Sequence, residues 1–521
     1  MINQNNKQLW VLLGCAVILV TVFLRAYQLQ HQGVILFDTA AFVFRADVLK
    51  MIVTSEQAFG QSYGYIDSKI LWLTLILLGK LFVVDADFTV LLLSCVFGCL
   101  TVWLTYFFAA RFYRSKVIGL LSAAFLSVSS YHIFYSRVGF PEAASGFFVL
   151  LSVYLYLRAI EKKWTFALAA GAALGAAFLL NAFRMGLVPL FVLALEMYFW
   201  LTRRDGYRFD KLRFVIFCLT AGITVFVGSS VLYGALNHFG VVMPSYIFGL
   251  KHHLSMHTDV GFDPWALLSF PYFIWFFEGA GFYLLLVFSA LTFRKNYSAA
   301  FPLFVVLIQG GIFSLTDQHV ARVLSIVLPF LSMIAAVSVY HLYQMAARRK
   351  VYRALMHVFV LFLFLESALR AYPLTQMRTS MPEAVAWVNK QDPQAGIIST
   401  HTFATALYSK SPLNENLFML TPDELRMLSE NGFKYILINH DKFRANETRL
   451  WNDPLLAEPI ASIETRCVFA KEWEDYSEYL QEILAYEHNT HLSNTFRLVN
   501  RINIDLGKIR VYELKACLDK L

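Results

Sequence analysis

The segment Gly33-Val34-Ile35-Leu36-Phe37-Asp38-Thr39-Ala40-Ala41-Phe42 carries one carboxylate among mostly apolar residues. It follows an apolar run from Leu9 to about Gln28, which is long enough to cross a bilayer. A charged side chain at a membrane is costly unless it is paired or used. Asp38 therefore has two interpretations. It caps an interfacial helix, since Asp is a favoured N-cap residue, or it takes part in chemistry at the membrane surface.

The composition is that of a protein that crosses a membrane many times. Of the 521 residues, 58% are hydrophobic and only 15% are charged, compared with about 25% charged residues in a soluble domain. The net charge of +8 comes largely from basic residues in short connections such as Arg111–Lys116 and Arg348–Arg353. This pattern is typical of cytoplasmic loops and argues against a nucleic-acid partner.

Apolar runs recur along the first 372 residues. They span 9–29, 70–84, 88–110, 117–135, 143–159, 166–181, 185–202, 213–234, 268–292, 299–315, 321–343 and 353–372. If the basic connections are cytoplasmic, run 9–29 passes outward and run 88–110 passes inward. A crossing by run 70–84 between them would break this alternation. The short run 70–84 is therefore predicted to lie along the outer surface. We therefore predict a multi-pass protein of the plasma (inner) membrane, with about eleven crossing helices and a cytoplasmic N-terminus.

The end of the chain is more polar, and it predicts a second domain. We expect a transmembrane module at 1–372 and an extracytoplasmic α/β domain at 373–521, within a mainly α, polytopic fold. Cys467 and Cys517 could pair there if this domain is outside. The expected strands are Ala395–Thr400, Lys434–Asn439 and Lys508–Leu514, and the expected helices are Pro382–Asn389 and Thr421–Asn431, the latter with a capping box.

Ionisable residues gather on the predicted outer side. Asp38 and Glu142 are predicted to lie in the first two outer loops, and a carboxylate there can act as a general base on an acceptor hydroxyl or amine. Nearby cations can stabilise a departing phosphate. The candidate cations are Lys69, Arg137, Arg184 and Arg322.

Each candidate also has a structural alternative. Glu142 follows Pro141 and could simply begin a helix. Lys69 could extend toward lipid headgroups. Arg137 and Arg184 could be interfacial anchors. Arg322 precedes an apolar helix, where the helix dipole does not favour a cation, and this favours a functional role.

Two histidines offer a metal site. His253 and His257 are four residues apart, a spacing that can bind zinc from one helical face. A solvated interfacial pair is the alternative. The sequence predicts no cofactor with certainty and leaves a divalent metal open.

The order of these motifs resembles the GT-C superfamily of membrane glycosyltransferases, and within it family 39, which includes the protein O-mannosyltransferases and the lipid A aminoarabinose transferase. One departure is Thr39, where the family commonly has Glu after the catalytic Asp. The resembling segments are Asp38–Phe42, Lys69–Thr74, Tyr135–Phe148, Asn181–Gly186 and His319–Pro329.

The resemblance implies that Asp38 is the catalytic carboxylate and that Glu142 positions the acceptor or a metal. It implies that Lys69 and Arg322 hold the donor phosphate, with Arg184 and Arg137 as further candidates. The donor would be a polyprenyl-phosphate sugar, the acceptor a lipid, glycan or protein, and the reaction an inverting single displacement.

Two alternative functions compete with this one. A lipid or sugar transporter, or flippase, predicts ionisable residues at mid-membrane and broken helices in repeated halves, and the sequence indicates neither. A non-enzymatic membrane assembly subunit would bind a partner through the outer domain.

Overall fold

The computed structural model describes residues 7–34, 39–40, 42–43, 69–82, 86–161, 163–202, 207–238, 266–292, 299–313, 321–346, 349–417, 420–439, 463, 466–475 and 507–520. Asp38, His253 and His257 lie outside these ranges. For Arg184, only the backbone is described.

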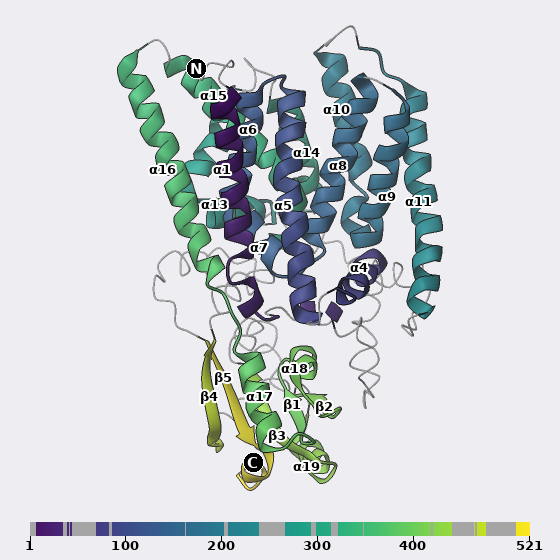
Figure 1. The fold of residues 1–521 in the computed structure, drawn as a ribbon, viewed down its shortest axis with the longest axis vertical. Coiled ribbons are helices and arrows are strands. Elements are labelled where there is room, and N and C mark those ends of the chain that lie inside the picture. The colour runs from purple at the N-terminus through teal and green to yellow at the C-terminus, as the bar shows by residue number, and fades with distance from the viewer. Residues whose placement is uncertain are drawn as a thin grey trace.

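Apolar helices form a bundle that makes up most of the described chain (Figure 1). Three shorter helices lie among them: η1 (Leu29–His31), α4 (Ile70–Lys80) and η6 (Ala321–Val327). The helices of the bundle are α1 (Lys7–Ala26), α5 (Ala86–Phe112), α6 (Lys116–Val128), α7 (Ser130–Arg137), α8 (Glu142–Glu161), α9 (Thr165–Met185), α10 (Val188–Leu201), α11 (Lys211–His238), α13 (Ala266–Thr292), α14 (Ala300–Phe313), α15 (Leu328–Ala346) and α16 (Lys350–Thr375).

The predicted apolar runs are mostly helical where they are described. Six described helices are long and apolar enough to cross a membrane, and the bent pair of α6 and α7 makes a seventh. In Figure 1, α4 lies obliquely at the end of the bundle nearest the C-terminal sheet, and the N-terminus lies at the opposite end. A mainly helical membrane protein is thus confirmed, while the number of eleven crossings and their orientation stay predictions.

Several helices are broken inside the bundle. The axes of α6 and α7 differ by 60°, and α13 is interrupted at Gly279, whose φ of +86° suits glycine. A break exposes backbone N–H groups that need acceptors. Glu278 accepts from the backbone N–H of Tyr131 at 3.2 Å, at the start of α7. Glu366 accepts from the N–H groups that follow Gly279, at 3.1 and 3.3 Å.

The sequence did not indicate these breaks, because the carboxylates that cap the exposed N–H groups, Glu278 and Glu366, have their partners in distant segments. Because the carboxylates of Glu278 and Glu366 cap exposed N–H groups, their positions are explained without a transport path.

A buried ion pair joins two bundle helices. Arg213 Nη2 of α11 lies 3.1 Å from Glu196 Oε1 of α10, and the Tyr156 hydroxyl donates to the same oxygen at 2.6 Å. Removing one partner would leave a buried charge uncompensated. Glu196→Gln should therefore lower the free energy of unfolding by about 3–5 kcal/mol, measured by denaturant titration in micelles.

Glu161→Gln is the matched control for this prediction. Glu161 also pairs with an arginine, Arg111, but both side chains are partly exposed, so its loss should be no more than about 1 kcal/mol. Equal destabilisation by the two variants would contradict the prediction.

The C-terminal part contains a five-stranded sheet of order β2-β1-β3-β5-β4. Strand β1 is parallel to β2 and β3, whereas β5 is antiparallel to β3 and β4. The strands are β1 (Gly396–Ser399), β2 (Asn414–Asn416), β3 (Phe433–Asn439), β4 (Phe469–Asp475) and β5 (Gly507–Glu513), and the helices are α17 (Met381–Gln391), α18 (Thr402–Tyr408), α19 (Pro422–Glu430) and α24 (Leu514–Leu518).

The predicted strands and helices of this region are confirmed, including the capping box between Thr421 and Glu424. Strands β2 and β4 were not predicted, because Asn-Glu-Asn and a segment with four charged residues lack the apolar alternation of a half-buried strand. A disulfide joins Cys467 and Cys517 across 50 residues of chain. That this region is a separate extracytoplasmic domain stays a prediction.

Candidate active site

The loop between α7 and α8 contacts residues of two of the predicted motifs, Thr39 and Arg322. Gly139 in this loop has φ +77°, and a Cβ there would lie 2.6 Å from Thr39 Cγ2. A larger residue would therefore keep Thr39 away. With glycine present, the Thr39 hydroxyl donates to the carbonyl oxygen of Val138 at 2.6 Å. Since Thr39 directly follows Asp38, this bond attaches the first predicted motif to the loop that leads into Glu142.

Glu142 is the first residue of α8 and is buried. Its Oε1 accepts a hydrogen bond from Asn181 Nδ2 at 3.4 Å. Asn181 has non-helical backbone angles inside α9 (φ −162°, ψ 76°) and precedes Arg184 by three residues. The structure thus brings together the second acid and Asn181, the first residue of the predicted Asn181–Gly186 motif. Glu142 also occupies a helix start, as its structural alternative predicted, where the dipole favours a carboxylate.

Lys69 immediately precedes α4, and only 1% of it is exposed. Its Nζ lies 5.8 Å from the centre of the Phe42 ring, within the range of a cation–π contact. Phe42 belongs to the same motif as Asp38. This burial differs from what extension toward headgroups would produce, and it places the cation beside the first motif.

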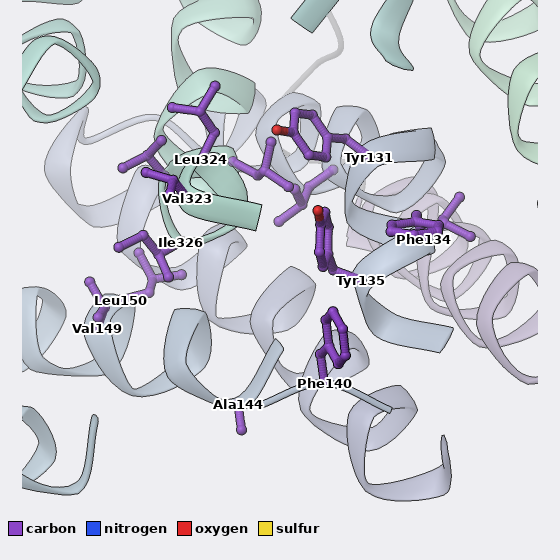
Figure 2. Packing of buried hydrophobic residues seen from close by; sticks show 14 of the residues in the cluster. Tyr131, Phe134, Tyr135, Phe140, Ala144, Val149, Leu150, Val323, Leu324 and Ile326 are labelled. Carbon is purple, nitrogen blue, oxygen red and sulfur yellow. The ribbon is translucent and has the colours of Figure 1, made fainter. Parts of the chain in front are cut away.

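Arg322 lies in η6, and its guanidinium carbon is 5.9 Å from the centre of the Phe140 ring. Helix η6 packs against the start of α8, where a Cβ on Gly146 would lie 3.7 Å from Ile326 Cα. Figure 2 shows Tyr131, Tyr135 and Phe140 one below another, with the side chains of Val323, Leu324 and Ile326 across from them. This packing fixes the position of η6 and hence of Arg322.

Arg137 is fully buried at the end of α7. Its Nη1 donates to the carbonyl oxygens of Arg25 and Tyr27, each at 3.0 Å, and its Nη2 donates to that of Thr375 at 3.4 Å. These bonds hold the end of α1 and the end of α16 against α7. Arg137 therefore holds segments of backbone together through their carbonyl groups.

Three hydrogen bonds near the predicted site could not be predicted from the sequence, because the two partners of each bond lie far apart along the chain. Tyr408 in α18 bonds to Asp87 and to the backbone of Val34. Gln32 Nε2 donates to the Arg137 carbonyl at 3.0 Å. No spacing signal within one segment could have indicated these contacts.

The metal prediction concerns residues outside the described part of the chain. Within the described ranges, no group of three or more His, Cys, Asp or Glu side chains could hold a metal ion. His253 and His257 fall outside those ranges, so their proposed metal site stays a prediction.

Comparison with known proteins identifies the fold. Residues 70–233 match the family model described as dolichyl-phosphate-mannose-protein mannosyltransferase. The structure is similar to ArnT from Cupriavidus metallidurans bound to undecaprenyl phosphate, with a TM-score of 0.58 and 13% identity over 98% of this chain and 99% of that chain. A search of curated proteins by sequence found no match.

A second similar structure is the apo oligosaccharyltransferase of Archaeoglobus fulgidus, with a TM-score of 0.53 and 10% identity over 85% of this chain and 71% of that chain. The matched family model and these structures are all of the GT-C type. They confirm the resemblance that the motifs indicated, and they show that the chain has the GT-C fold.

Proposed function

We propose that the chain is a membrane glycosyltransferase that moves a sugar from a polyprenyl-phosphate-linked donor to a lipid, glycan or protein acceptor at the extracytoplasmic face. The observation that carries this proposal is the bond from Thr39 to Val138. It joins the Asp38 motif to the loop before Glu142, and Lys69 and Arg322 contact aromatic rings of these same two segments. The similarity to ArnT bound to undecaprenyl phosphate supports the donor class.

The proposed chemistry is a single displacement. Asp38 takes the proton of an acceptor hydroxyl, whose oxygen attacks the anomeric carbon of the donor sugar. The bond from that carbon to the phosphate oxygen breaks, and the electron pair leaves with the polyprenyl phosphate. Lys69 and Arg322 neutralise the phosphate charge as it develops. Attack from the face opposite the leaving group inverts the anomeric centre.

The remaining predicted residues have supporting roles in this proposal. Glu142, which accepts a hydrogen bond from Asn181, positions the acceptor or a divalent metal. His253 and His257 are a separate candidate pair for a metal. Arg184 follows Asn181 and supplies a third cation toward the donor. We assign Arg137 to support of the backbone, because its Nη atoms already donate to carbonyl groups.

The proposal is tested with the purified chain in lipid nanodiscs and a panel of polyprenyl-phosphate sugars. Mass spectrometry should detect free polyprenyl phosphate and a glycosylated acceptor, while nucleotide sugars should give no product. In a parallel experiment, the chain in sealed vesicles is given the same labelled donors. Movement of intact donor between leaflets without cleavage would contradict the proposal and favour the flippase alternative.

A further inference from the structure

The C-terminal region touches the segment that leads into Asp38. The Tyr408 hydroxyl of α18 donates to Asp87 Oδ2 at 2.9 Å, near the start of α5. The same hydroxyl accepts a hydrogen bond from the backbone N–H of Val34 at 3.3 Å. Val34 lies four residues before Asp38. One side chain of the C-terminal region therefore connects the bundle to the backbone that carries the proposed base.

The two residues before Val34 also contact the C-terminal region. The Thr379 N–H donates to the Gln32 carbonyl at 2.9 Å. Gly33 has φ +65°, and a Cβ on it would lie 2.8 Å from Thr379 Cγ2 and 3.6 Å from the Tyr408 hydroxyl. Only glycine allows this turn and this close approach without strain. The backbone from Gln32 to Val34 is thus packed directly against the C-terminal region.

On the other side of Asp38, the chain is attached to the bundle. The Thr39 hydroxyl donates to Val138, so Asp38 lies between two hydrogen-bonded residues, Val34 and Thr39. The five Cα–Cα steps from Val34 to Thr39 span at most about 18 Å. Val34 and Thr39, the described residues nearest to Asp38 on either side of it in the chain, are thus both held by hydrogen bonds.

The protonation state of Tyr408 suits this double contact. Burial, together with the charge of Asp87, raises the pKa of Tyr408 well above its ordinary value. The hydroxyl therefore keeps its proton over the physiological pH range and donates it to Asp87. Its oxygen remains available to the Val34 N–H, as a phenol can donate and accept at once.

We propose that the C-terminal region positions the catalytic carboxylate, and that Tyr408 is the positioning residue through its hydrogen bonds to Val34 and Asp87. This inference rests on the proposed function, because it concerns the placement of Asp38. It assigns the C-terminal region a part in catalysis at the membrane surface in addition to any contact with an acceptor.

The main test is Tyr408→Phe in the full-length chain in nanodiscs, assayed with the polyprenyl-phosphate sugar that the wild type uses. A small displacement of a reacting group lowers turnover by roughly ten- to a hundredfold, so kcat should fall by that factor while KM for the donor stays unchanged. Hydrogen exchange at the Val34 amide should become faster. Tyr435→Phe, whose ring packs on Trp387 in the same region, is the matched control and should leave kcat unchanged.

Gly33→Ala tests the same contact from the backbone and keeps the inference falsifiable if Tyr408→Phe unfolds. It should lower kcat in the same way, whereas Gly222→Ala, at a helical site with open space around it, should not. The inference would be overturned if Asp38→Asn is inactive but Tyr408→Phe keeps the wild-type kcat and the wild-type exchange rate at Val34. If Tyr408→Phe unfolds, the same result in Gly33→Ala would overturn it. An active Asp38→Asn would instead overturn the catalytic assignment on which the inference rests.

Discussion

Asp38→Asn is expected to lower the turnover number of sugar transfer by about 10²–10⁴-fold, the usual contribution of a general base. Asparagine has nearly the shape of aspartate but cannot accept the proton of the acceptor hydroxyl. The neighbouring contact of Thr39 with Val138 does not involve the Asp38 side chain, so the segment should keep its attachment. The measurement is kcat with a saturating polyprenyl-phosphate sugar.

Asp210→Asn provides the same chemical change outside the proposed site. Asp210 precedes α11 and accepts from the backbone N–H groups of Leu212 and Arg213 at 3.0 and 3.3 Å. Asparagine caps helices about as well as aspartate, so this variant should retain wild-type turnover. If Asp38→Asn were equally active, Asp38 would have no part in proton transfer.

Lys69→Met is expected to produce the second largest loss, about 10²–10³-fold in kcat, which is typical of removing one group that stabilises developing charge. Lys69 is buried against the Phe42 ring, where an ammonium interacts with a phosphate more strongly than it does in water. Methionine retains much of the apolar stem, so the packing on Phe42 should persist. Turnover and the affinity for undecaprenyl phosphate are measured together.

Lys80→Met is the control on the same helix, at the opposite end of α4. It removes the same charge from a more exposed site and should leave both measurements near the wild-type values. A Lys69→Met variant with unchanged turnover and unchanged lipid-phosphate affinity would exclude the proposed phosphate contact. A loss of affinity with unchanged kcat would mean that Lys69 binds the ground state and transition state equally.

The helices and the motifs could be predicted from local patterns. Long apolar runs must satisfy their backbone groups internally in a bilayer, and a helix does so within one segment. For this reason the described parts of the runs became helices, and Pro422 with Glu424 marked the start of α19. The order of Asp38, Lys69, Glu142 and Arg322 along the chain was enough to indicate the GT-C type.

The helix breaks could not be predicted in this way. Gly279 stands within the predicted run 268–292, whose composition suits a continuous helix. A break becomes stable only when a distant group accepts the exposed N–H bonds, as Glu366 does for the residues after Gly279. The acceptor lies 85 residues or more along the chain, so no local window contains both halves of the cause.

By itself, the sequence determined that this chain is a helical membrane protein with a polar C-terminal region and a set of acids and cations typical of GT-C enzymes. Those features depend on residue type and on short-range periodicity. Only the tertiary structure decided that Thr39 meets Val138, that Arg137 binds backbone carbonyls, and that Tyr408 reaches Val34. Each of these bonds depends on how distant helices pack, because a hydrogen bond forms only when folding brings donor and acceptor to within about 3 Å.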